Sequence, residues 1–209
     1  MKLYAYWRST TSFRVRIALN LKGFSYDIVP VDLVKGEQRT PEYAAMNPGR
    51  GVPMLELDDG TRLTQSLAII DYLDHLRPEP ALLPAEPLAR ARSMAAADVI
   101  ALDIHPVNNL RVIGRLKQMG HSQQEAVAWM NHWMHEGFAA YQAMIRPDTR
   151  FSFGNTPDLA DICLTAQMYN ARRWGLDLSP FARIVEIEQA CLALPAFDAA
   201  RPENQPDAT

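Results

Sequence analysis

The residues best suited to chemistry lie near the start of the chain, where three hydroxyl side chains follow an apolar, aromatic run. Residues 2–7 read Lys-Leu-Tyr-Ala-Tyr-Trp, which is typical of a β-strand. Ser9, Thr10 and Thr11 come next, and an amphipathic helical pattern follows them. Hydroxyl and backbone N–H groups at a helix N-terminus can bind an anion such as a thiolate. The bland alternative is a simple helix N-cap, which these residue types favour by about two to one.

Two further dipeptides could present backbone or hydroxyl groups to a ligand. Val52-Pro53 precedes a strand, and a cis bond there would expose the Val52 backbone to an extended peptide. Only ~5–6% of X-Pro bonds are cis, so a trans bond is expected. Gln65-Ser66 opens a helical pattern that runs to residue 76. Ser66 suits an N-cap, and its hydroxyl and N–H could equally bind a carboxylate.

Polar and cationic residues recur in the second half of the chain. His105, Asn108, Asn109 and Arg111 surround a proline, and they suit either a pocket for an anionic or amide-rich ligand or a polar helix end. No second His or carboxylate stands at a metal-ligand spacing, so no metal site is expected.

A pair of neighbouring arginines, Arg172 and Arg173, lies further along the chain. Neighbours cannot share a helix face, so we expect one to face solvent and the other the interior. With Arg8 and Arg111 they could clamp carboxylates, or they could be unrelated surface residues.

The first eighty residues alternate between strand-like and helix-like patterns. Strands are expected at residues 2–7, 26–31, 53–57 and 62–64, and helices at 12–22, 41–46 and 66–76. Gly23 suits the position just after a helix, and Asp58-Asp59-Gly60 is typical of a hairpin turn. This order predicts a small mixed sheet backed by helices.

A proline-rich stretch then separates two parts of the chain. Its residues 81–87 are the expected linker between a first domain at 1–80 and an all-helical second domain at 88–209. Helices are expected at 88–108, at 122–145 and from a capping box at Asp158 to Trp174. The polar tail at 201–209 is expected to be loosely ordered.

Composition excludes several classes of protein. The 209 residues are 48% hydrophobic and carry a net charge of −3, so no basic field favours nucleic acid or a membrane surface. Cys163 and Cys191 sit in apolar helical patterns, which argues against a disulfide framework and for a reducing compartment. The pattern shows neither a secretory signal nor a membrane span, so a cytoplasmic protein is expected.

Residues 8–19, Arg-Ser-Thr-Thr-Ser-Phe-Arg-Val-Arg-Ile-Ala-Leu, resemble the N-terminal signature of zeta-class glutathione transferases. The likeness covers essentially the whole chain, through the segments at 47–48, 52–53, 65–70, 82–84, 159–161, 176–180 and 205–207. It implies a thioredoxin-like α/β N-terminal domain, an all-α C-terminal domain and a homodimer. The family signature usually reads Ser-Ser-Cys where this chain has Ser9-Thr10-Thr11, so a second thiol is absent here.

The resemblance also implies roles for individual residues. Ser9 matches the position that holds the sulfur of glutathione. Other positions match the family's glutathione contacts: Thr10, Thr11, Gln38, Val52, Gln65, Ser66, His105, Asn109 and Arg111. Arg8, Arg111 and Arg173 match arginines that hold the substrate carboxylates.

The implied activity is a glutathione-dependent cis–trans isomerisation of maleylacetoacetate to fumarylacetoacetate, in tyrosine and phenylalanine catabolism. One alternative is the isomerisation of maleylpyruvate in gentisate catabolism. A second is conjugation of glutathione to electrophilic or halogenated substrates, and a third is a non-catalytic binding module. The two maleyl substrates differ by one methylene, which a pocket discriminates by only ~1–3 kcal/mol.

Overall fold

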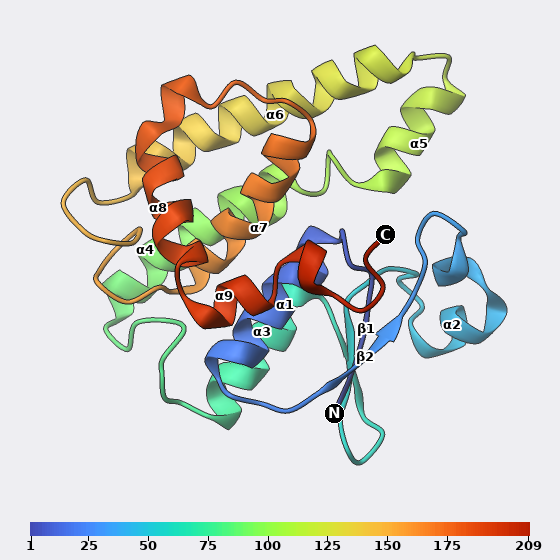
Figure 1. Cartoon of the computed structure of the whole chain (residues 1–209), viewed down its shortest axis with the longest axis horizontal. Coiled ribbons are helices and arrows are strands. Elements are labelled where there is room, and N and C mark those ends of the chain that lie inside the picture. The colour runs from blue at the N-terminus through green and yellow to red at the C-terminus, as the bar shows by residue number, and fades with distance from the viewer. The chain divides into compact units, whose positions relative to one another are not determined.

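The computed structural model describes residues 1–209 and divides into two compact units. The sheet unit consists of Met1–Ala81 together with Ala193–Thr209, and the helical unit is Leu82–Leu192 (Figure 1). The sequence places residues 193–209 with the helical domain, whereas in the structure they belong to the sheet unit. None of the helices combines the length and apolar character needed to cross a membrane.

A four-stranded mixed sheet forms the centre of the sheet unit, in the order β2-β1-β3-β4. Its strands are β1 (Lys2–Ala5), β2 (Asp27–Pro30), β3 (Met54–Glu56) and β4 (Arg62–Thr64). β1 runs parallel to β2, with Leu3 opposite Ile28, and antiparallel to β3, with Leu3 opposite Leu55. The β3–β4 hairpin turns at Gly60, whose φ of 84° suits glycine, as the sequence predicts.

Helices cover both faces of this sheet. They are α1 (Thr10–Leu21), α2 (Pro41–Met46), α3 (Ser66–Leu76) and α9 (Pro195–Ala199). α1 packs against α3 and α9 (Figure 1). Because strand side chains alternate between faces, Leu3 and Ala5 are buried on one face while Tyr4 packs against Tyr43 of α2 on the other. Gly23, at φ 63°, ends α1 as predicted.

The helical unit contains no strand. Its helices are α4 (Pro87–Asp98), α5 (Leu110–Gln118), α6 (Gln123–Met144), α7 (Leu159–Arg173) and α8 (Ala182–Leu192), with a 3-10 turn at Ser179–Phe181. The two-part architecture confirms the predicted fold class.

The single helix expected at 88–108 is wrong in its second half. After α4 the chain widens into a π-helical segment, Val99–Ile104, in which the His105 N–H donates to the Ile100 carbonyl at 3.1 Å. Pro106 has no N–H and its ring clashes with the preceding turn, which explains why the helix ends here. Gly137 of α6 lies against this segment, since a Cβ added to it would stand 2.3 Å from Ile104.

A buried carboxylate anchors the start of α7. Asp158 caps the helix, and the reciprocal bond from the Asp158 N–H to Asp161 Oδ2 at 2.9 Å confirms the predicted capping box. Asp161 Oδ1 accepts from the N–H and the hydroxyl of Ser152, at 2.9 and 2.6 Å. Burial, and secondly the nearby Asp158, raise the pKa of Asp161 to about 7.

The tail is packed, contrary to the prediction of loose order. Pro202 and Gln205 are buried, and Gln205 Nε2 donates to the carbonyls of Ala199 and Arg201. Asp207 accepts from the Trp7 backbone N–H at 3.1 Å. Side-chain amide and carboxylate groups thus satisfy backbone atoms here, which a polar composition alone does not indicate.

Candidate functional site

Ser9 connects β1 to α1. Its backbone is extended (φ −71°, ψ 118°), and its Oγ accepts from the Ser12 N–H at 3.2 Å, so it is the N-cap of α1. No acidic residue occupies the first turn of α1. The first turn of α1 therefore supplies no carboxylate of its own to offset the positive end of the helix dipole. The cap interpretation is confirmed, and thiolate binding by the same hydroxyl stays a prediction.

A short relay of hydroxyl groups joins Ser9 to the Val52 backbone. Thr11 Oγ1 donates to the Val52 carbonyl at 2.9 Å, and Ser9 Oγ lies 2.9 Å from Thr11 Oγ1. A hydroxyl has one hydrogen, so with the Thr11 hydrogen on Val52, Ser9 is the donor to Thr11. An anion bound at Ser9 would compete with Thr11 for that hydrogen. Thr10 is buried beside them in the first turn of α1.

The Val52–Pro53 bond is cis, which contradicts the expectation of a trans bond. The prediction that Ser66 caps α3 is also wrong, because Gln65 is the cap residue and Ser66 is the first residue of the helix. Gln65 has a φ of 70°, an unfavourable conformation for a side-chain-bearing residue. Residues in such conformations cluster at ligand sites. The positive φ of Gln65 therefore agrees with the predicted ligand-binding role of Gln65 and Ser66.

Gln38 lies in a short 3-10 turn (Glu37–Arg39) and is 8% exposed. Its Oε1 is buried and accepts no hydrogen bond. Buried polar atoms are nearly always paired, so this acceptor is available to a donor from outside the chain.

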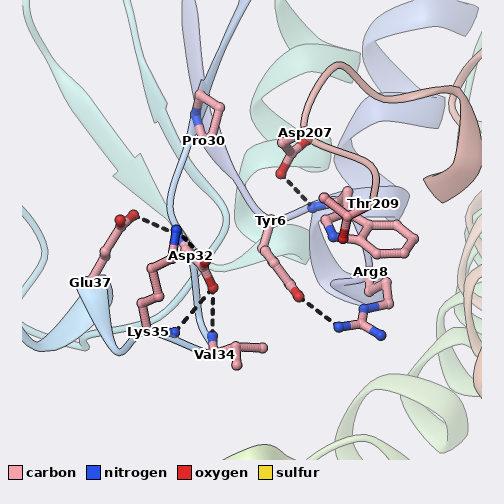
Figure 2. A pocket seen from close by; sticks show the side chains of 10 residues that line it. Tyr6, Arg8, Pro30, Asp32, Val34, Lys35, Glu37, Asp207 and Thr209 are labelled. Atoms are coloured by element: carbon pink, nitrogen blue, oxygen red, sulfur yellow. Dashed lines mark hydrogen bonds and ion pairs between the residues drawn. The ribbon is translucent and has the colours of Figure 1, made fainter.

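Arg8 lines a cavity of about 490 Å³ in the sheet unit (Figure 2). Its Nη2 donates to the Tyr6 hydroxyl at 2.9 Å, and its Cζ lies 4.6 Å from the centre of the Trp7 indole. Lys35 and Asp207 line the same cavity. Sequence reasoning missed Tyr6, Lys35 and Asp207. For Tyr6, the sequence did carry a signal: the aromatic pair Tyr6-Trp7 directly precedes Arg8 and could have indicated a contact with its side chain.

In the helical unit, Asn109 and Arg111 meet at the start of α5. Asn109 is the N-cap, and its Oδ1 accepts from the Arg111 N–H at 3.1 Å, so the helix-end interpretation is confirmed for this residue. The Arg111 side chain is exposed. His105 is partly buried at the end of the π-helical segment, and Asn108 Nδ2 donates to the Met130 carbonyl.

The expectation of one inward and one outward arginine in α7 is wrong, because Arg172 and Arg173 are both exposed. Arg172 Nε donates to both carboxylate oxygens of the buried Glu188, at 3.0 Å each. The Arg173 Cζ lies 4.6 Å from the centre of the Trp174 ring. Arg172 is thus committed to an ion pair, and a role of Arg173 toward a ligand carboxylate stays a prediction.

The structure brings the predicted residues together in two sets. Ser9, Thr11 and Val52 are joined by hydrogen bonds in the sheet unit, and Asn109 contacts Arg111 in the helical unit, where Arg173 lies on a different helix. No three His, Cys, Asp or Glu side chains gather so as to hold a metal ion.

A mixed sheet of order β2-β1-β3-β4, with a capped α1 and an accompanying helical unit, defines the class of glutathione transferases. Residues 8–76 match the glutathione S-transferase N-terminal domain. A maleylacetoacetate isomerase of Pseudomonas aeruginosa is 46% identical over 99% of this chain and 98% of its own. The chain therefore belongs to the zeta-class glutathione transferase family, which includes maleylacetoacetate and maleylpyruvate isomerases.

Two solved structures support the same assignment. The holo structure of a maleylpyruvate isomerase, described as a bacterial zeta-class glutathione S-transferase, superposes with a TM-score of 0.97 at 44% identity and covers both chains completely. A maleylacetoacetate isomerase of Methylobacterium extorquens AM1, with bound malonate and glutathione, has a TM-score of 0.96 at 38% identity, again over both complete chains.

Proposed function

We propose that this chain is a glutathione-dependent cis–trans isomerase that converts maleylacetoacetate to fumarylacetoacetate in tyrosine and phenylalanine catabolism. The observation that carries this proposal is a hydroxyl N-cap, Ser9, on a helix whose first turn has no acidic residue. The preceding residue, Arg8, lines a cavity together with Lys35 and the acidic residues Asp32, Glu37 and Asp207. The names of the relatives support the same activity, and they do not favour the alternatives.

The residues of the sheet unit fit glutathione as a cofactor. Glutathione is an extended peptide with several N–H donors, and the buried, unpaired Oε1 of Gln38 would accept one of them. When bound, it supplies a thiol that adds reversibly to the cis double bond of the substrate. Ser9 turns its hydroxyl hydrogen from Thr11 toward the sulfur, and the N-terminus of α1 stabilises the negative charge.

The other proposed glutathione contacts are those that the family resemblance implies. Val52 would pair with the peptide backbone, and Gln65 and Ser66 would hold a carboxylate at the N-terminus of α3. The remaining contacts are those of Thr10, Thr11, His105, Asn109 and Arg111.

The substrate carries two carboxylates, for which Arg8, Arg111 and Arg173 are the proposed partners. Guanidinium groups bind carboxylates through paired N–H donors, and they also stabilise charge that develops on the ketone oxygen. Arg111 and Arg173 are exposed, so their side chains are accessible to a ligand. Arg172 is left out because Glu188 occupies its guanidinium.

We further propose a homodimer in the cytoplasm. Apolar side chains are exposed on α4, where Leu88 and Met94 are 57% and 40% accessible. Beside them a cavity of about 310 Å³ is lined mainly by apolar residues, among them Ala91 and Met144. A second copy would cover such a surface. Both cysteines are buried and neither forms a disulfide, which suits a reducing compartment.

A substrate panel tests the activity. Purified protein with glutathione is given maleylacetoacetate (or its analogue maleylacetone), maleylpyruvate and a generic aryl halide in parallel. We expect fast isomerisation of the first, slower isomerisation of maleylpyruvate and slow conjugation of the halide. Rapid conjugation without isomerisation would make the chain a detoxifying transferase, and a higher kcat/KM for maleylpyruvate would reverse the substrate assignment.

A further inference from the structure

The tail of the chain carries a carboxylate that binds the turn between β1 and α1. Asp207 Oδ2 accepts from the Trp7 backbone N–H at 3.1 Å, and Figure 2 shows this bond beside the cavity that Arg8 lines. The two residues are 200 positions apart in the sequence, so the bond fixes a long-range contact. A hydrogen bond to a charged acceptor is stronger than one between neutral groups.

The carbonyl of Trp7 is fixed as well. Arg16 is completely buried, and its Nη2 donates to the Trp7 carbonyl at 3.1 Å. Its Nε donates at 2.9 Å to the carbonyl of Ala200, the residue that ends α9 just before the tail. Both polar groups of the Trp7 backbone are thus held. The N–H is held directly by the tail, and the carbonyl is held by Arg16, which is itself bonded to the end of α9.

Trp7 in turn supports Arg8. The guanidinium lies over the indole, with its Cζ 4.6 Å from the ring centre, and Nη2 donates to the Tyr6 hydroxyl. A side chain with this many rotatable bonds keeps one orientation only where its neighbours hold it. A shift of the Trp7 backbone would move the indole and release Arg8. Ser9, in contrast, is held by the first turn of α1 through the Ser12 N–H.

We propose that Asp207 is a positioning residue for substrate binding: it fixes Trp7, and through Trp7 it orients Arg8 toward a carboxylate of the ligand. This inference rests on the proposed role of Arg8 in the isomerase. The charge of Asp207 has the opposite effect, because a carboxylate near the cavity repels a dianion. Replacing Asp207 should therefore weaken ligand binding if Asp207 positions Arg8, and should strengthen ligand binding if Asp207 acts only through its negative charge.

The test compares Asp207→Ala, Asp207→Asn and a control, Glu203→Gln, which removes an exposed charge from the same tail. The probe is malonate, titrated by calorimetry into protein saturated with glutathione, with KM, kcat and glutathione affinity measured alongside. We expect Asp207→Ala to weaken malonate binding roughly fivefold to tenfold and to raise the substrate KM similarly, with kcat and glutathione affinity little changed. Asp207→Asn keeps an acceptor oxygen and should recover most of the loss, and Glu203→Gln should behave as the wild type.

The same substitutions in an Arg8→Ala background complete the cycle. If Asp207 acts through Arg8, Asp207→Ala has no further effect on malonate there. Three outcomes would each overturn the inference. Malonate could bind Asp207→Ala as tightly as the wild type or more tightly, or Asp207→Ala could have its full effect in the Arg8→Ala background. Malonate affinity could also be unchanged by Arg8→Ala alone. A wild-type protein that binds malonate with this dependence but isomerises nothing would refute the proposed function alone. Melting curves identify any variant that fails to fold, and Asp207→Asn then carries the test.

Discussion

The two units hold their candidate site residues in opposite ways. In the sheet unit, Ser9, Thr11 and Arg8 are each fixed by hydrogen bonds to neighbouring groups. In the helical unit, Arg111 and Arg173 are exposed to solvent, and the Arg173 guanidinium lies over the Trp174 ring.

This difference fits two kinds of ligand. A cofactor that returns in the same form after each cycle is served by a rigid site, which pays little entropy on binding. A substrate whose carboxylates move apart during a cis-to-trans change is served by long cations that can follow it. We therefore expect substitutions of Ser9 and Thr11 to affect the reaction rate, and substitutions of the carboxylate-binding arginines, or of the residues that position them, to affect substrate binding.

The largest effect should come from Ser9→Ala. Loss of the hydroxyl that meets the sulfur should lower kcat by about 10²-fold, while loss of the cap should lower the free energy of unfolding by about 1 kcal/mol. Steady-state isomerase assays and urea titration measure the two. Ser12→Ala is the matched control, because the Ser12 hydroxyl is buried without a hydrogen bond in the same helix turn. Equal kcat in Ser9→Ala and wild type would mean that Ser9 is only a cap.

The next effect contrasts the neighbouring arginines of the helical unit. Arg173→Ala should raise the substrate KM about tenfold, equivalent to about 1.4 kcal/mol, with little change in stability. Arg172→Ala should leave KM unchanged but lower the free energy of unfolding by ~1–3 kcal/mol, because the buried Glu188 carboxylate loses its partner. Assays at varied substrate and thermal unfolding of both variants separate the two roles. If KM rises in Arg172→Ala and not in Arg173→Ala, Arg172 is the residue that binds the substrate carboxylate.

A smaller effect should follow from Thr11→Val, which removes the relay between Ser9 and Val52. The Ser9 hydrogen is then free for the sulfur, so a larger fraction of bound glutathione should be thiolate at neutral pH. Ultraviolet difference spectra of the glutathione complex measure this fraction. The lost bond to Val52 should cost about 1 kcal/mol of stability. Thr11→Ser keeps the hydroxyl and should match the wild type, and a thiolate fraction that falls in Thr11→Val would contradict the competition between Thr11 and the sulfur.

The last prediction concerns stability alone, through the pH dependence of the helical unit. Burial raises the pKa of Asp161 to about 7 in the folded chain, above its ordinary value of 3.8. The folded state thus holds a proton that the unfolded state releases, and this contribution to stability is lost as the pH rises toward the folded pKa. The free energy of unfolding, from urea titrations at about pH 5 and about pH 8, should be lower at the higher pH.

Two variants sharpen that measurement. Asp161→Asn should flatten the difference between the two pH values. Asp148→Asn should leave it unchanged, because the exposed Asp148 has a pKa lowered by its hydrogen bond to Arg146 and stays ionised across the range. A stability that rises with pH in the wild type would show that the hydrogen bonds to Asp161 outweigh its burial.

Local signals in the sequence account for most of the sheet unit. Strand alternation, Gly23 and the Asp-Gly turn determine elements through neighbouring residues, so the pattern was sufficient. The cap at Ser9 was predictable for the same reason. Ser66 was misplaced by one residue because the positive φ of Gln65 depends on its surroundings and has no signature in residue type.

Long-range contacts account for the misses. The bond from Trp7 to Asp207 joins positions 200 residues apart, and no periodicity reports it, so the packed tail and its place in the sheet unit were not predicted. The commitment of Arg172 to Glu188 depends likewise on how α8 packs against α7. The glutathione and substrate roles came from resemblance to a family, because hydroxyl and arginine side chains alone suit both structural and chemical uses.

The most direct test of the central claim is the fate of glutathione during turnover. Purified wild-type protein is mixed with a small amount of glutathione and a large excess of maleylacetone, and isomer and free thiol are followed together by NMR and thiol titration. The account predicts complete conversion to the trans isomer, no conversion without glutathione, and an unchanged amount of free thiol at the end. Conversion that stops when one equivalent of glutathione is consumed, or that proceeds without it, would contradict a catalytic role for the cofactor held by Ser9.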